Sequence, residues 1–284
     1  MVIVNFVWEL CPVGRGCGVV NYAEHKGVMV SMVMRFAIGF FGFARKIPNL
    51  YDIDKFLSLF PEGSVVDIFI SVPTVVDEYL NINTLVDQNT LMGIFGDRLK
   101  VADFFEYDPH KHIRKARTLG LADFNATHNY HPYRQFSLIY SISNISKIIN
   151  DYSGDYDNIV LTRFDIIHTI TSFGRLLEDK NTDTIYGFRD GSPTLFEDRI
   201  IISCKDGIER MAAMYDTFVP SSRDETKHII EFFLAQYVNE QINIKKGVLK
   251  DLNIGLNREW TYGCNGKYSE LFKNYINSIL IEYP

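Results

Sequence analysis

The stretch Tyr156–Ile167, YDNIVLTRFDII, decides the fold. A polar turn leads into three apolar residues, 159–161, and then into Arg163 and Asp165. Residues two apart on an extended chain point to the same side, so we expect these two charges to share one side of a strand. Two charges beside an apolar strand are costly to bury without partners. They therefore either form a buried ion pair that braces the sheet or face an open cleft, where Asp165 can hold a divalent cation and Arg163 can face a phosphate.

Strand and helix patterns alternate on both sides of this stretch. The polar segment Glu106–Pro132 is rich in His and Pro and predicts a loop. Alternating strands and helices predict an α/β fold, a single Rossmann-like domain with a mostly parallel, mixed central sheet flanked by helices. The predicted strands are 34–45, Val65–Ser71, Leu99–Phe105, Thr184–Phe188, Arg199–Ser203 and Ile242–Val248. The predicted helices are Tyr51–Phe60, Thr84–Phe95, Tyr133–Tyr152, Asp206–Phe218 and Glu225–Asn239.

The chain has 284 residues, of which 46% are hydrophobic, and this suits one large α/β domain or two small ones. Residues 1–33 are rich in glycine and have no clear period, so we expect a poorly ordered N-terminal extension. A short extra strand on the sheet edge is the alternative for this segment. The ordered domain is expected to span residues 34–284.

The formal net charge of -6 argues against nucleic acid as a partner, because nonspecific phosphate contacts need a basic surface. A few placed arginines or a metal could still bind a small anionic ligand. The four cysteines form no CxxC pair, so we expect reduced thiols in an intracellular, cytoplasmic protein, with one disulfide between distant cysteines as the alternative. The longest apolar-rich run, Val28–Phe43, is too short for a transmembrane segment, and Met1–Leu10 lacks the basic region of a signal peptide.

The end of the first strand carries two further candidate ligand-binding residues, since ligands of open α/β sheets bind outside the carboxyl ends of the strands. Gly42 lets the backbone approach a ligand closely, and Arg45 could contact a phosphate through two parallel hydrogen bonds. Arg45 could equally be an ordinary surface arginine. The spacing Gly39-x-x-Gly42 does not match the dinucleotide-binding fingerprint.

Asp190 and Asp198 are candidate general bases for an acceptor hydroxyl, because a carboxylate facing the cleft can accept its proton. A solvated loop is the alternative for both. The histidine pairs His110-x-His112 and His128-x-x-His131 suit zinc poorly, since neither comes with a thiolate or a well-spaced carboxylate set. His168, three residues after Asp165, is a better candidate to approach a metal or phosphate.

The order of four segments, FAIGFFGFAR, VDIFISV, YRQFSLIYSISNISKIINDY and YDNIVLTRFDI, resembles one enzyme family. It is similar to the GT-A fold, nucleotide-sugar-dependent glycosyltransferases of bacterial polysaccharide genes and of large DNA viruses, including algal viruses. In these enzymes an Arg-x-Asp element stands in for the usual Asp-x-Asp at a strand end. The resemblance spans roughly Arg35 to Val248. It implies a nucleotide-binding half at about 34–165 and an acceptor half at about 166–284.

The resemblance implies a hexosyl- or pentosyltransferase that moves a sugar from a nucleoside diphosphate donor to a hydroxyl of a glycan or glycoprotein acceptor. Asp165 would meet Mn²⁺ or Mg²⁺ and the diphosphate, with Arg45 and Arg163 near the nucleotide. Asp198 or Asp190 would face the acceptor sugar. Arg163 replaces the first aspartate of the usual motif, which puts strict metal dependence in question. A viral member of this family would act in the host cytoplasm.

Two other functions are compatible with the same residues. A nucleotidyltransferase or metal-dependent phosphoesterase usually needs a denser carboxylate set around two metals than one aspartate at the decisive strand end. A non-catalytic binding module with the same fold is the third reading, because fold alone does not fix function.

Overall fold

The computed structural model describes residues 33–44, 50–74, 87–121, 132–170, 172–173, 176–178, 180–188, 199–221, 230–240 and 245–249. By its internal contacts the chain divides into two units, Met1–Met32 and Val33–Pro284, and every described residue belongs to the second. The expected N-terminal extension therefore lies outside the described residues, apart from Val33.

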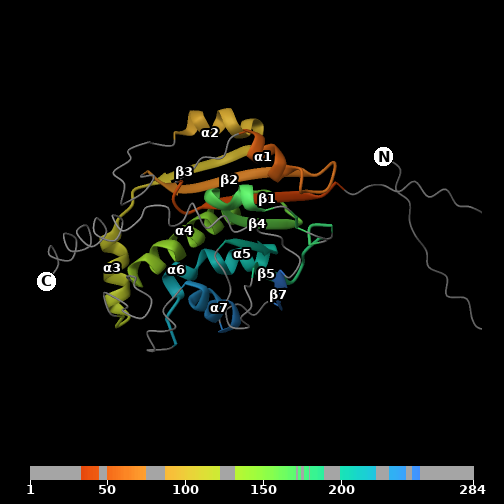
Figure 1. Cartoon of the computed structure of the whole chain (residues 1–284). Helices are drawn as coiled ribbons and strands as arrows, with labels where there is room; N and C mark the ends of the chain where they lie inside the picture. The colour runs from red at the N-terminus through yellow and green to blue at the C-terminus, as the bar shows by residue number, and fades with distance from the viewer. Residues whose placement is uncertain are drawn as a thin grey trace, which may run out of the picture. The chain divides into compact units, whose positions relative to one another are not determined.

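A seven-stranded sheet with the order β3-β2-β1-β4-β6-β5-β7 forms the centre of the fold (Figure 1). Strands β1 to β4 are parallel to one another, and β5 and β7 run in the same direction. Strand β6 is reversed, because it pairs antiparallel with both β4 and β5. The prediction of a mostly parallel, mixed sheet is confirmed. The strands are β1 Arg35–Phe41, β2 Val65–Pro73, β3 Leu99–Phe105, β4 Asn158–Arg163, β5 Thr184–Phe188, β6 Ile200–Ser203 and β7 Lys245–Leu249.

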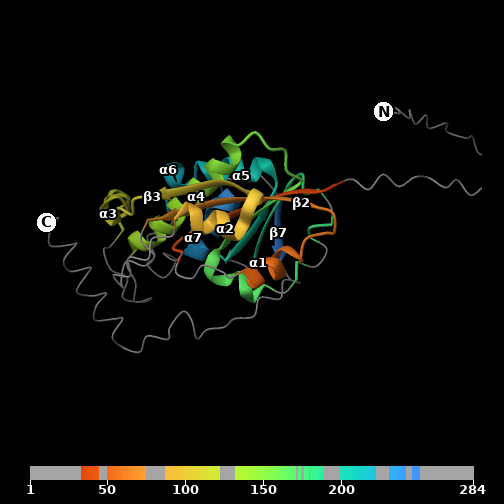
Figure 2. The same cartoon turned by 90° about the horizontal axis from the view of Figure 1, so that it is seen from above.

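Helices cover both faces of this sheet (Figures 1 and 2). One face packs against α1, α2 and the 3₁₀ helix η2, and the other packs against α4, α5, α6 and α7. Helix α3 lies against α4. The helices are α1 Leu50–Leu57, α2 Gln88–Phe95, η1 Gly96–Arg98, α3 Pro109–Thr118, α4 Pro132–Asp151, η2 Phe164–Thr169, α5 Lys205–Ala212, α6 Met214–Thr217 and α7 Ile230–Glu240. Among these described helices, none is long and apolar enough to cross a bilayer.

Strand β1 is buried on both sides, as expected for a central strand of a parallel sheet. Phe36, Ile38 and Phe40 belong to the core beneath α1 and α2, whereas Ala37 and Phe41 belong to the core beneath α4. Gly39 shares the α4 side with these last two, because side chains alternate along a strand. Its missing side chain leaves room for α4 to lie directly on the strand.

A network of polar contacts around the Asp67 carboxylate lies at the amino end of the sheet. Asp67 of β2 is buried and accepts a hydrogen bond of 2.9 Å from the Tyr156 hydroxyl. Arg35 and Lys100 lie 3.7 and 3.4 Å from its two oxygens. Burial, and then the hydrogen bond to Asp67, raises the pKa of Tyr156 above its ordinary value, so the phenol remains a neutral donor. The network ties β1, β2, β3 and the turn before β4 together.

The structure corrects the predicted loop at Glu106–Pro132, because α3 occupies Pro109–Thr118. Asp108 caps this helix by accepting a hydrogen bond of 3.2 Å from the Lys111 amide, and Pro109 follows in the first turn. The helix buries only His112, Ile113 and Ala116. Such a short apolar stripe among basic residues gave too weak a helical period to detect.

Two predicted helices have different limits in the structure. Asp87 has extended backbone and caps α2 by accepting a 2.7 Å hydrogen bond from the Thr90 amide, so the helix begins after it and not at Thr84. The single helix predicted over Asp206–Phe218 is two helices, α5 and α6, interrupted at Ala213. The sequence does not predict this break, since no Gly or Pro lies at Ala213 or beside it to end a helix.

Gly39→Ala should destabilise the protein by about 1–3 kcal/mol through overpacking. The added methyl group would lie 2.7 Å from Ile145 Cγ1 and Leu161 Cδ2 and 2.8 Å from Ile149 Cδ1. Urea unfolding should show a lower midpoint at an unchanged slope. Gly93→Ala on the exposed side of α2, where a methyl group meets nothing within 4 Å, should instead stabilise the protein by up to about 1 kcal/mol. Equal stability of the two variants would contradict this account.

Candidate functional site at the carboxyl edge

The strand order reverses direction at β1. From β1 the chain continues to β2 and β3 on one side, and then crosses through α4 to β4 on the other side. Ligands of open α/β sheets bind in the crevice outside the carboxyl ends of the strands at such a topological switch point. The carboxyl ends of β1 and β4 are therefore the candidate site.

Gly42 and Arg163 come together at this point. Phe41, the last residue of β1, pairs in register with Arg163, the last residue of β4, and Gly42 follows directly. Gly42 has a φ of 80°, a left-handed conformation that favours glycine. A methyl group at Gly42 would lie 3.9 Å from Arg163 Cγ, and the Arg163 side chain is partly exposed. The site thus places a glycine backbone beside the side chain of an arginine.

The structure corrects the expectation that Arg163 and Asp165 share one side of an extended strand. Strand β4 ends at Arg163, and the 3₁₀ helix η2 begins at Phe164. Phe164 stacks on Phe40 with ring centroids 4.5 Å apart and planes 5° apart. This contact holds the first turn of η2 against the face of the sheet that α1 and α2 cover. The backbone of Asp165 lies in this turn, and its side chain lies outside the described residues, so both readings of the Arg163–Asp165 pair stay predictions.

The predicted bases Asp190 and Asp198, together with Arg45, lie outside the described residues. The two ends of the connection that carries both aspartates are described. Strand β5 runs parallel to β4 and ends at Phe188, and the reversed β6 starts with Ile200 paired to Thr162. The Thr162 hydroxyl donates a 3.0 Å hydrogen bond to the carbonyl oxygen of Arg199. The connection therefore leaves and re-enters the sheet at the carboxyl edge.

A polar network that the sequence did not reveal lies across the neighbouring strands. Asp103 of β3 pairs in register with Ser71 of β2, which pairs with Phe41 of β1. The Asp103 carboxylate accepts a 2.7 Å hydrogen bond from the Asn144 amide of α4 and a 3.0 Å bond from the Ser71 hydroxyl. The Asn144 amide also donates to the Ser71 oxygen at 2.8 Å. This network fixes α4 to the ends of β2 and β3 beside the site.

The histidines described here do not form a metal site. His112 is buried, and its Nδ1 lies 3.1 Å from the Tyr215 hydroxyl oxygen. Burial, and then the charge of Lys111, lowers the pKa of His112 to about 3, so the imidazole is neutral. His128 and His131 and the side chain of His168 lie outside the described residues. Within the described part of the chain, no three His, Cys, Asp or Glu side chains come together as a metal-binding group.

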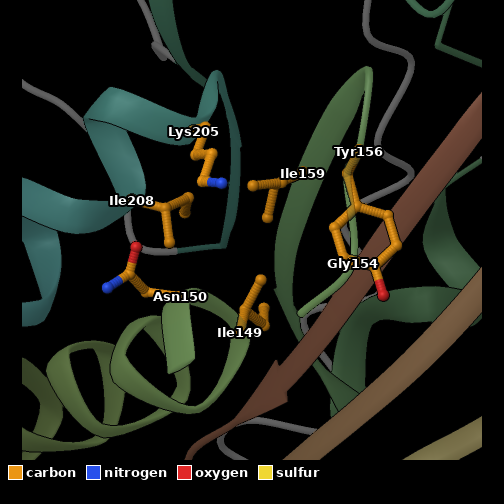
Figure 3. Close-up of a pocket in the computed structure, with 7 residues that line it drawn as sticks. All are labelled: Ile149, Asn150, Gly154, Tyr156, Ile159, Lys205 and Ile208. Atoms are coloured by element: carbon orange, nitrogen blue, oxygen red, sulfur yellow. The ribbon is translucent and has the colours of Figure 1, made fainter. Parts of the chain in front are cut away.

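Two hollows in the described residues lie at the amino end of the sheet. One is a cavity of about 10 Å³ onto which Ile149, Ile159 and Ile208 converge, with Lys205 beside them (Figure 3). It holds at most one water molecule. The other is an open depression at the turn between α1 and β2, and Arg98 lines it. Neither hollow lies at the switch point, so neither replaces the carboxyl edge as the candidate site.

Stability should fall on acidification because His112 is neutral when buried but takes up a proton in the unfolded chain. Its pKa is about 3 in the folded protein and about 6.5 in the unfolded chain, so the stabilisation is complete above pH 6.5 and is lost as pH falls towards 3. Between pH 7 and pH 5 this contributes a loss of about 2 kcal/mol in urea unfolding. His112→Gln should remove this slope, and His110→Gln should keep it. Identical slopes for all three proteins would contradict the assignment.

The carboxyl edge thus combines Gly42 and Arg163 at the switch point with the return of the chain at Arg199. No protein-family model matches the chain, and no curated protein matches it. Any function assigned to this edge therefore rests on strand order, register and the contacts of individual side chains.

Proposed function

We propose that the protein is a glycosyltransferase that transfers a sugar from a nucleoside diphosphate sugar to a hydroxyl of a glycan acceptor. One observation carries the proposal: Gly42 and Arg163 lie together at the carboxyl ends of β1 and β4, where the strand order reverses. A diphosphate needs both close approach to the backbone and a cationic partner, and this pair supplies both.

Each residue of the site has a role in this proposal. Arg163, with Arg45 as a further candidate, neutralises the diphosphate that departs from the sugar. Asp165 lies two residues after Arg163, in η2, and is the candidate ligand of Mn²⁺ or Mg²⁺, which would spread the charge of the leaving group. Asp198 or Asp190 accepts the proton of the acceptor hydroxyl.

The reversed strand β6 supports the choice of base. Asp198 directly precedes Arg199, whose carbonyl oxygen is bonded to Thr162 next to Arg163. A parallel strand would begin at the amino end of the sheet, far from the switch point. Because β6 is antiparallel to β4, the residues before it belong to the chain that arrives at the carboxyl edge.

A thermal-shift screen with UDP, GDP and a panel of nucleotide sugars, with and without Mn²⁺, tests the function. A ligand that binds only the folded state raises the melting temperature. Stabilisation by a nucleoside diphosphate, followed by slow hydrolysis of one nucleotide sugar, would support the transferase. Stabilisation by nucleoside triphosphates alone would favour a nucleotidyltransferase, and no response to any nucleotide would favour a non-catalytic module.

Asp165→Ala should abolish turnover of the nucleotide sugar and leave the melting temperature of the free protein within the range of a surface change, about 0.5 kcal/mol in stability. Asp97→Ala is a matched control, because Asp97 lies exposed in the other 3₁₀ helix, η1, at the amino end of β3. This control should keep full activity. An Asp165→Ala enzyme as active as the control would refute the assigned role.

Gly42→Ala should weaken nucleotide binding, whereas Gly63→Ala should not. Both glycines have a φ of 80°, so an added methyl group should cost each variant a similar backbone strain of about 1–2 kcal/mol. Gly63 lies in the turn before β2 at the amino end of the sheet, where a methyl group meets nothing within 4 Å. Calorimetric titration with the stabilising nucleotide separates the two effects. Equal affinity in both variants would remove Gly42 from the site.

A further inference from the structure

Helix α3 is a concentrated basic surface on an acidic protein. Within Pro109–Thr118 it has four lysines and arginines and no acidic residue, whereas the whole chain carries a net charge of -6. Its apolar side, with Ile113 and Ala116, is buried. Lys111, Arg114 and Arg117 are exposed at successive spacings of three residues, so they follow one another along the solvent side of the helix.

Helix stability explains only part of this charge. Lys115 and Arg117 lie in the last turn, where cations interact favourably with the helix dipole. Lys111 lies in the first turn, where a cation is unfavourable. Its ammonium group lies 4.0 Å from the ring centroid of Tyr140 and 5.1 Å from that of Tyr215, so two aromatic faces hold it in place. A cation kept at an unfavourable helix position suggests a role in binding.

The basic helix lies at the same end of the sheet as the candidate site. Figures 1 and 2 both place α3 beyond the carboxyl end of β3. Contacts between rings connect it to the switch point. Phe43, directly after Gly42, contacts Tyr107 at a centroid distance of 5.1 Å, and Tyr107 contacts His112 of α3 at 6.0 Å. Side-chain packing therefore joins α3 to the segment that follows Gly42.

Among the described residues, the carboxylates near the helix make only weak contacts with its cations. Arg114 lies 3.6 Å from the Asp108 carboxylate, and both side chains are about half exposed. Asp216 meets Lys115 through its backbone carbonyl oxygen at 3.3 Å, and its own side chain is exposed, as is Glu106. An ion pair at this exposure is weak, so a competing anion can displace Asp108 from Arg114.

The exposed side of α3 has no large apolar side chain. The large hydrophobic residues that are exposed in the described part of the chain lie elsewhere: Val33, Leu50, Tyr51, Val65, Met92 and Val219. A helix that binds in a membrane interface needs such an apolar face in addition to its cations. The surface therefore suits a hydrated polyanion better than a lipid bilayer.

We propose that α3 binds the acceptor, and that the acceptor is a polyanionic glycan whose carboxylate, sulfate or phosphate groups contact Lys111, Arg114 and Arg117. This inference rests on the proposed function, because the bound glycan is an acceptor only if the protein is a glycosyltransferase. The binding itself needs neither donor nor turnover. It can therefore be tested separately from the enzymatic activity.

The test is calorimetric titration of the full chain with polygalacturonate, a carboxylated glycan, and with neutral dextran of matched length. The protein should bind polygalacturonate in a salt-sensitive manner and should not bind dextran. The triple variant Lys111→Gln, Arg114→Gln, Arg117→Gln should lose roughly tenfold in affinity, since each exposed ion pair contributes a modest amount. The control variant Lys55→Gln, Arg98→Gln, Lys205→Gln removes the same charge from other exposed positions and should change affinity less than about twofold.

Three results would overturn the inference. They are the absence of polygalacturonate binding, an equal loss in both triple variants, and tighter binding to phosphatidylserine vesicles than to polygalacturonate. Circular dichroism confirms that each variant is folded, and Lys111→Gln alone provides a milder version of the same comparison. If nucleotide-sugar hydrolysis persists while polygalacturonate does not bind, only the acceptor assignment fails. If polygalacturonate binds but no nucleotide does, the glycosyltransferase proposal fails instead.

Discussion

The pairing of β1 with both β2 and β4 is the constraint on which the rest of the fold depends. Two parallel neighbours bury β1 on both faces, so its side chains must be apolar on each side. On the α4 side the helix lies so close that only Gly39 fits, and on the other side Phe40 stacks against Phe164. The same pairing makes the carboxyl end of β1 the point where the strand order reverses.

Much of this architecture could be predicted from local sequence. The strands Leu99–Phe105 and Thr184–Phe188 have the limits that the sequence predicts, because each is a short run rich in apolar residues. Helix α3 was missed because its stability comes from the Asp108 cap and from three buried residues, and not from a long apolar period. The break between α5 and α6 has no local signal, and the contacts that span it come from α4, whose Ser143 hydroxyl bonds to the Met211 carbonyl oxygen and the Tyr215 amide.

Part of the candidate site could also be predicted from the sequence, and part could not. Glycine and arginine at strand ends are visible in the sequence, and strand order then brings Gly42 and Arg163 together. The network of Asp103, Ser71 and Asn144 joins residues that are 32 to 73 positions apart, so no local pattern could reveal it. The sequence predicts an extended strand that continues through Asp165, and this was wrong. The strand ends at Arg163, and a 3₁₀ helix begins at Phe164, whose ring stacks on Phe40.

The reversal of β6 has a consequence for where this chain can accept changes in sequence. Because β5 and β6 are adjacent and antiparallel, the segment between Phe188 and Arg199 is anchored by hydrogen-bonded strands at both of its ends. Insertions, deletions or exchanges inside such a segment leave the sheet register intact, since loop length costs little once the flanking strands are fixed. The segment is thus a place where foreign sequence can be inserted, because the two strands that hold its ends keep their pairing with the rest of the sheet.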